Sequence, residues 1–169
     1  MPGLRKVARH GFYTGILSID EVSLIEVVIA ADEIVILEVY QQLEERLLKN
    51  DSDWRLPKDF ITICQHVHFD NLYKVALGLV CRKPEILFES KDFLTMEEND
   101  LIQLLKCDDL NLEEIEIWKY LIKWGIENTD SILNDDITKW TSTDFMNLEN
   151  TLRNCIPHIR FYNMLPHDY

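Results

Sequence analysis

The sequence predicts an all-α fold, and three observations carry that prediction. The 169 residues include only five glycines and five prolines, so long uninterrupted elements are feasible. Apolar residues recur three or four positions apart along most of the chain, which is the period of an amphipathic helix. No long stretch alternates apolar and polar residues as a half-buried strand would. A chain of this length is expected to bury about 70% of the surface that its unfolded form exposes, so a helical core can form.

Four helices are predicted in the N-terminal half. The first follows Asp20, whose carboxylate can cap it, and the second covers about residues 34–49. A third helix is expected to run through KDFITICQHVH, because Pro57 suits a first helical turn. The fourth begins at Asp70 and ends before Pro84, since proline disfavours the helical conformation of the residue that precedes it.

Three more helices are predicted in the C-terminal half. Thr95 and Glu98 have the spacing of a capping box and open the first of them. The last covers about residues 144–155 and is ended by Pro157. Between these two helices lies a segment with a broader apolar face than either.

That segment is DDLNLEEIEIWKYLIKWG, residues 108–125. Asn111 and Glu114 are predicted to form a capping box, and Gly125 is expected to close the helix in the left-handed conformation. The wide apolar arc between them predicts a helix packed against more than one neighbour. The core residues expected from this helix and the last one are Trp118, Leu121, Ile122, Trp124, Phe145, Leu148 and Leu152.

Charge and composition exclude several classes of partner. Asp and Glu number 30 against 17 Lys and Arg, a net charge of −13, which disfavours binding to nucleic acid or to an anionic membrane. No apolar run reaches the roughly 18–20 residues that span a bilayer. The four cysteines have irregular spacing, which predicts reduced thiols and a cytoplasmic protein, with the nucleus as the second compartment.

Catalysis is not expected from this sequence. It has no GxSxG nucleophile turn and no phosphate-binding glycine loop, and neighbouring acids on a helix point about 100° apart, which suits no catalytic pair. No cofactor is expected. Cys64, His66 and His68 form CxHxH, but only Cys64 and His68 would share a helix face, and a closed zinc site needs four ligands. A small metal-binding enzyme built on these two residues is a further alternative, which the lack of a second ligand pair disfavours.

A resemblance to a known family covers most of the chain. The run FESKDFLTMEENDLIQLLKCDDLNLEEIEIWKYLIKWG (88–125) is similar to the centre of a BACK domain, and CIPHIRFYNM (155–164) resembles that domain's closing motif. Upstream, FYTGIL (12–17) and residues 23–48 resemble the C-terminal helices of a BTB/POZ domain. In fungal BTB–BACK–TLDc proteins and in Kelch-like adaptors these two domains follow one another.

The resemblance implies a domain arrangement. Residues 1–49 would be a partial BTB/POZ domain, residues 50–57 a linker and residues 58–169 the BACK domain. A complete BTB domain has a β-sheet ahead of its last helices, and few residues precede Phe12 here. The apolar faces at 22–29 and 34–48 must therefore find another surface, and any part of them left exposed is a candidate interaction site.

The resemblance also implies a non-catalytic protein–protein interaction module, similar to a substrate adaptor of cullin-RING ubiquitin ligases but incomplete. The implied partner is a cullin scaffold or another BTB protein. An alternative is a fragment that only pairs with full-length BTB–BACK relatives. In cullin adaptors the first BACK helices extend the cullin surface, which points to Phe60, Ile63 and Tyr73, with Tyr40 from the preceding helix. The competing interpretation is that these four side chains fill the core, as aromatic residues usually do.

Overall fold

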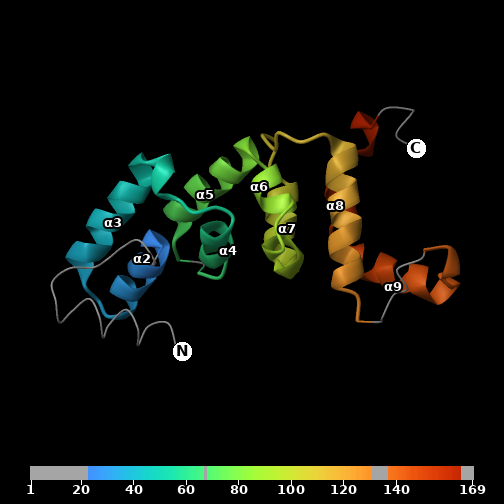
Figure 1. The fold of residues 1–169 in the computed structure, drawn as a ribbon, viewed down its shortest axis with the longest axis horizontal. Helices are drawn as coiled ribbons and strands as arrows, with labels where there is room; N and C mark the ends of the chain where they lie inside the picture. Colours follow the sequence, from blue (N-terminus) through green and yellow to red (C-terminus); the bar gives the residue numbers. More distant parts are fainter. Residues whose placement is uncertain (1–22, 67, 131–136, 165–169) are drawn as a thin grey trace. The chain divides into compact units, whose positions relative to one another are not determined.

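Every regular element in the described part of the chain is helical, so the all-α prediction is confirmed (Figure 1). The computed structural model describes residues 23–66, 68–130 and 137–164. The α-helices are α2 (Leu24–Glu33), α3 (Leu37–Lys49), α4 (Lys58–Cys64), α5 (Asp70–Arg82), α6 (Glu85–Phe88), α7 (Glu98–Leu105), α8 (Glu114–Glu127) and α9 (Ser142–Leu152). Short 3-10 helices lie at Asp51–Asp53, Asp92–Thr95, Ile137–Lys139, Ile156–His158 and Phe161–Asn163.

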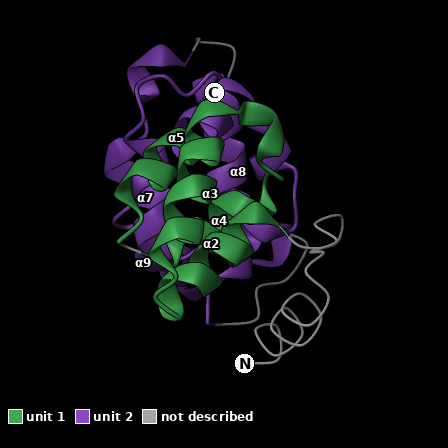
Figure 2. Ribbon diagram, turned by 90° about the vertical axis from the view of Figure 1, so that its left-hand side faces the viewer, with its two compact units in different colours: residues 1–76 green, residues 77–169 purple. Residues whose placement is uncertain are grey.

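The chain divides into two compact units, residues 1–76 and 77–169, which Figure 2 shows in different colours. The point of division falls inside α5, so this helix contributes residues to both units. Each unit is described separately below.

A buried hydrogen-bonded group begins the described part of the first unit. The side-chain oxygen of Ser23 accepts a hydrogen bond from the amide of Ile25 and so caps α2. The same hydroxyl donates to Asp59 Oδ1 at 2.5 Å, and Asp59 Oδ2 accepts from the amide of Arg55 at 2.7 Å. These contacts join the start of α2 to the start of α4 and satisfy a carboxylate that is only 1% exposed. The predicted cap at Asp20 lies outside the described residues.

The helices α2 and α3 pack against each other as a hairpin (Figure 1). They differ in how much they bury. Five residues of α2 are buried, whereas α3 fully buries only Leu47. The indole of Trp54 packs nearby and donates a hydrogen bond to the carbonyl oxygen of Leu47 at 3.0 Å. The first half of α3 is therefore a largely exposed helix with apolar residues on its surface.

The second unit corrects two predicted helix caps. The N-cap of α7 is Glu97, and the hydroxyl of Thr95 instead bonds back to the carbonyl of Asp92 at 2.9 Å. The N-cap of α8 is Glu113, which is extended and makes no side-chain cap bond. The amide of Asn111 donates to the carbonyl of Cys81 at 3.0 Å. The predicted boxes at Thr95 and Asn111 are therefore wrong.

A capping box does occur at α9. This helix begins at Ser142, two residues before the start that the sequence predicts. The amide of Thr141 donates to Asp144 Oδ2 at 2.7 Å, and the amide of Asp144 donates back to Thr141 Oγ1 at 3.4 Å. The Asp144 carboxylate accepts from the Thr141 amide and also from the Thr141 hydroxyl, at 2.8 Å, and these two bonds hold the pKa of the Asp144 carboxyl below its usual value.

The core of the second unit differs in part from the expected one. Leu121, Trp124, Leu148 and Leu152 are buried. Trp118 and Ile122 are only half-buried, and the Trp118 ring meets Phe161 at the surface, with ring centroids 5.4 Å apart. Phe145 is 49% exposed and packs edge-on against Trp140, so its assignment to the core is wrong. The helical spacing therefore assigned more residues to the core than α8 and α9 bury.

Gly125 does not end α8. The helix continues to Glu127, and Gly125 lies where α8 meets α9. A Cβ atom at this position would come within 2.6 Å of Leu152 Cδ2 and 2.8 Å of Leu148 Cδ1. The absence of a side chain therefore permits close helix packing, which is a different use of glycine from the predicted left-handed closing residue.

Candidate interaction surfaces

The four residues proposed as partner contacts do not lie together on the surface. Phe60 is fully buried and Ile63 is 1% exposed, so neither can meet a partner, and their assignment as contacts is wrong. Tyr40 and Tyr73 are half-buried. Tyr73 stacks on Phe60 with centroids 6.1 Å apart. Phe60 and Ile63 instead fill the core of the first unit, as the competing interpretation expects.

The connection between α2 and α3 has an unusual backbone conformation. After α2 ends, the amide of Val35 donates to the carbonyl of Asp32 at 3.0 Å, and the amide of Ile36 donates to the carbonyl of Ala31 at 2.9 Å. This pair of bonds is a Schellman motif, in which the residue at the Val35 position takes the left-handed conformation. Val35 has φ 57°, whereas this position is normally occupied by glycine.

A β-branched residue is strained in this conformation, by about 1–2 kcal/mol relative to right-handed backbone. Strain of this kind persists where the surrounding structure imposes it and is common at binding sites. Val35 is also 83% exposed, so packing of its side chain does not compensate for the strain. An exposed apolar side chain at a position that favours glycine is a candidate contact residue.

Three neighbours extend this feature into a surface. Ile34 is 52% exposed, Leu37 is 62% exposed and Val39 is 39% exposed. We call these three residues and Val35 the apolar corner. Single exposed apolar residues are common on proteins, but four within six positions around one turn form a local patch.

Acidic residues surround the apolar corner. Asp32, Glu33 and Glu38 are exposed beside it, and residues 23–45 contain no lysine or arginine. Such a rim favours a partner that carries lysine or arginine around an apolar contact, because opposite charges speed encounter and disfavour wrong partners.

An aromatic cluster lies close to this surface in the first unit. Tyr40 of α3 stacks on Phe69 with centroids 6.0 Å apart, and His68 lies 4.1 Å from the same Phe69 ring. His68 Nε2 lies 3.1 Å from Asp32 Oδ2. Burial, followed by a hydrogen bond with Glu44 and its negative charge, raises the pKa of Tyr40 to about 12. Tyr40 therefore keeps its proton and stays an uncharged part of the surface.

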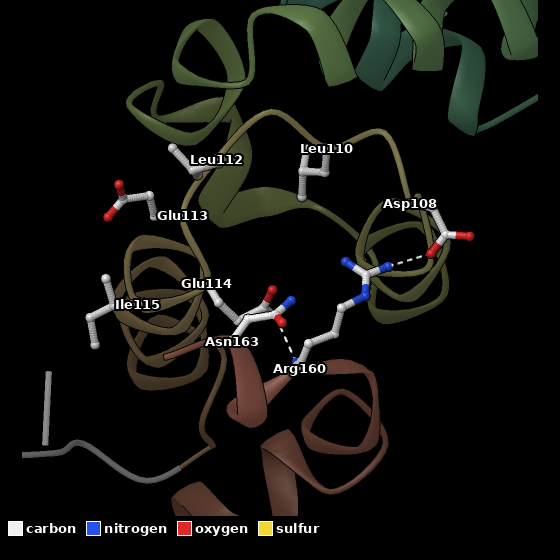
Figure 3. A pocket seen from close by; sticks show the side chains of 8 residues that line it. All are labelled: Asp108, Leu110, Leu112, Glu113, Glu114, Ile115, Arg160 and Asn163. Carbon is white, nitrogen blue, oxygen red and sulfur yellow. Dashed lines mark hydrogen bonds and ion pairs between the residues drawn. The ribbon is translucent and has the colours of Figure 1, made fainter. Parts of the chain in front are cut away.

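The second unit contains a pocket of about 390 Å³ at the start of α8 (Figure 3). Its walls come from the segment before α8, from the first turn of that helix and from the C-terminal residues Arg160 and Asn163. The eight described residues that line it include no serine, cysteine, threonine, histidine or lysine. No nucleophile or general base of the usual kinds is available there except carboxylates.

Arg160 joins the C-terminal segment to α8. Its amide donates to Glu114 Oε1 at 2.7 Å, and its guanidinium Nη2 donates to Asp108 Oδ1 at 2.7 Å (Figure 3). Glu114 is 8% exposed, so the bond satisfies a nearly buried carboxylate. Ile159 is buried and Phe161 meets Trp118. The Ile-Arg-Phe run thus holds the C-terminal segment against α8. The pocket lies between these two packed segments.

A second pocket, of about 420 Å³, lies between the start of α7 and the sides of α8 and α9. The side-chain Nδ2 of Asn128 donates to the carbonyl of Leu94 at 2.9 Å, and the side-chain Nδ2 of Asn154 donates to Glu98 Oε1 at 3.1 Å. These side chains hold neighbouring segments together. The polar side chains that line this pocket therefore have a structural role.

The CxHxH stretch does not have the predicted geometry. Because α4 ends at Cys64, Cys64 and His68 do not share a helix face, and His68 lies beside Asp32. Across the described residues, no three His, Cys, Asp or Glu side chains lie where they could hold one metal ion. No described helix combines the length and the apolar composition that crossing a membrane requires.

The comparison with protein families finds a match within residues 58–135. The model of the BACK family, described as BTB And C-terminal Kelch, matches residues 58–135, which include α4 to α8. No curated protein and no solved structure matches the chain. The predicted resemblance to BACK is therefore confirmed for residues 58–135, and the resemblance of residues 12–48 to a BTB domain stays a prediction. A BACK match indicates an interaction module of the adaptor type.

Proposed function

We propose that this chain is a non-catalytic protein-interaction module of the BTB–BACK type, and that the apolar corner is its docking surface. The observation that carries the proposal is Val35, which is 83% exposed and strained at φ 57°. A strained residue that contributes nothing to the core is expected where its side chain is needed elsewhere. The family match at residues 58–135 supports the adaptor class.

The proposed domain arrangement is a partial BTB domain over residues 1–49, a linker over residues 50–57 and a BACK domain over residues 58–169. The start of the family match at residue 58, which is also the first residue of α4, supports the last boundary. In this arrangement the apolar corner lies in the BTB-like part. We assign it a protein partner with an apolar contact and a basic rim, because Asp32, Glu33 and Glu38 surround the corner.

The partner we propose is the N-terminal region of a cullin scaffold, which would make the chain an adaptor of a cullin-RING ligase working in the cytoplasm or nucleus. The alternative is pairing with a full-length BTB–BACK relative. Both proposals use the apolar corner as the contact surface, and they differ in which protein binds there.

The test measures binding of the purified chain to an immobilised cullin N-terminal domain and, in parallel, to a BTB–BACK protein. Leu37→Glu is the informative variant, because Leu37 is exposed in the first turn of α3, where an acid is compatible with the helix dipole. Affinity for the true partner should fall at least about tenfold, since an acid would enter an apolar contact. Met146→Glu, at an exposed apolar position of α9, is the matched control and should bind as the wild type does.

Binding to the cullin alone supports the adaptor role, and binding to the BTB protein alone supports the pairing alternative. Equal loss of binding in both variants would show that charge in general, and not the apolar corner, controls the interaction. If neither protein binds, while a chain extended by a complete BTB domain does bind the cullin, the adaptor role of this chain is refuted.

A further inference from the structure

Two of the four cysteines lie against each other in the second unit. Cys81 is in the last turn of α5 and Cys107 lies just after α7, yet their Sγ atoms are 2.6 Å apart. Both are free thiols. A disulfide has a sulfur separation of about 2.05 Å, so the bond can form with a small movement of the side chains.

The two thiols differ in access to solvent. Cys81 is 2% exposed, whereas Cys107 is half-buried. Burial, followed by the hydrogen bond to the Cys107 thiol and the charges of Cys107 and Asp109, raises the pKa of Cys81 to about 12. A small oxidant can reach Cys107, and Cys81 lies where it can attack only the sulfur of Cys107.

The backbone already holds the same two segments together. The carbonyl of Cys81 accepts from the amide of Asn111 at 3.0 Å, and the amide of Cys107 is held by the carbonyl of Leu104 at 3.1 Å. The next residue, Asp108, pairs with Arg160. The Cys107 side chain is therefore presented from a segment that is fixed on both sides, which favours reaction with its neighbour.

We propose that Cys81 and Cys107 are a thiol pair that undergoes reversible disulfide formation with low-molecular-weight disulfides. The Cys107 thiolate attacks one sulfur of the small disulfide, breaks its S–S bond and releases one small thiolate. Cys81 then attacks Cys107 Sγ, forms the internal disulfide and releases the second small thiolate. The two protons of the protein thiols end on the two released thiols, so one small disulfide is reduced for each bridge formed.

The bridge would close the loop of residues 82–106 and join the end of α5 to the segment that leads into α8. Asp108, in the same segment, pairs with Arg160, so formation of the bridge would change the position of a residue that contacts the closing Ile-Arg-Phe run. The pair is thus a modification site in the part of the chain that matches the BACK family, and it does not depend on the proposed function.

The experiment equilibrates the wild-type chain with bis(2-hydroxyethyl) disulfide. This probe is uncharged, so repulsion by Asp108 and Asp109 does not affect its approach. Free thiols are then blocked with N-ethylmaleimide and the protein is digested with trypsin. Each cysteine falls in its own tryptic peptide: residues 59–74, 75–82, 107–119 and 154–160.

The proposal expects a linked pair of peptides 75–82 and 107–119, an intact mass lower by about 2 Da before blocking, and two blocked cysteines in the other two peptides. A reducing agent should restore four thiols. Four blocked cysteines after oxidation, or a link to peptide 59–74 or 154–160, would overturn the proposal. This wild-type measurement decides the matter even if a cysteine variant fails to fold.

Three variants test the order of attack. Cys81→Ser should trap the probe on Cys107, which adds about 76 Da to peptide 107–119. Cys107→Ser should form no bridge and leave Cys81 unmodified, because the oxidant does not reach it. Cys64→Ser, at a cysteine outside the pair, is the matched control and should form the bridge as the wild type does. A probe adduct on Cys81 in the Cys107→Ser variant would contradict the assigned order.

Discussion

Gly125 and Leu152 lie so close that a Cβ atom on Gly125 would come within 2.6 Å of Leu152 Cδ2. This contact sets how closely α8 and α9 approach each other. Leu148 lies on the same side, with Cδ1 2.8 Å from the position of that Cβ. Both leucines are buried.

Gly125→Ala should therefore lower the free energy of unfolding by about 1–3 kcal/mol, even though alanine favours the helix. Gly78→Ala is the matched control, since Gly78 lies within α5 and has no atom within 4 Å of a Cβ. That change should raise the free energy of unfolding by about 0.5–1 kcal/mol. Urea denaturation of the two variants measures both effects. A stabilised Gly125→Ala variant would contradict the close approach of α8 and α9.

The two tryptophans of α8 should respond differently to truncation. Trp124 is 3% exposed, and its indole donates to the carbonyl of Met96 at 3.1 Å. Trp124→Ala should cost about 3–5 kcal/mol, because it removes a buried ring and leaves that carbonyl without its donor. Trp118→Ala should cost roughly 1–2 kcal/mol, because half of the burial is already absent in the native state. Equal losses in urea denaturation would contradict the half-buried placement of Trp118.

Val35→Gly separates stability from binding. Glycine adopts φ 57° without strain, so the free energy of unfolding should rise by about 1 kcal/mol. The same change removes a side chain of the apolar corner, so affinity for the partner should fall. Val39→Gly makes the same substitution at a helical position of α3 and should lower the free energy of unfolding by roughly 0.5 kcal/mol. A destabilised Val35→Gly variant would show that position 35 does not adopt the left-handed conformation.

Tyr40 should make stability fall at alkaline pH. Its pKa is about 12 in the folded chain against an ordinary value of 10.0, so the folded state holds the proton more tightly. The resulting stability is fully present below pH 10 and is lost as the pH rises towards 12. In urea denaturation the stability of the wild type should fall relative to that of Tyr40→Phe between pH 10 and 12, because only the wild type carries the ionising phenol. A difference that does not change with pH would exclude Tyr40 as the source.

Helix existence was predictable from the sequence because it depends on local spacing. The end of the fourth helix, just before Lys83-Pro84, was predicted correctly because a proline is a local signal, and its start was predicted to within one residue, since α5 begins at Asp70 itself. The box at Asn111 failed because a contact distant in sequence competes for that residue: its amide bonds to Cys81 across the second unit. Local propensity contains no information on such a competitor.

The inward or outward direction of a side chain was less predictable. The family resemblance pointed to Phe60 and Ile63 as contacts, but it does not show whether a side chain meets solvent or core, and the structure buries both. Phe145 shows the opposite error: it has the helical spacing of Leu148 and Leu152, which are buried, but it is itself exposed. Burial depends on which neighbours occupy the space, and that is a tertiary property.

By itself, the sequence determined that this chain is helical, acidic and similar to a BACK domain, because composition, spacing and family motifs are properties of the linear chain. Only the tertiary structure decided that Val35 takes a strained exposed position, that Gly125 admits Leu152 and that Cys81 meets Cys107. The Gly125–Leu152 and Cys81–Cys107 contacts join residues more than 25 positions apart in the sequence, and the Val35 angle belongs to the turn that connects α2 to α3. No pattern of residue types specifies those distances.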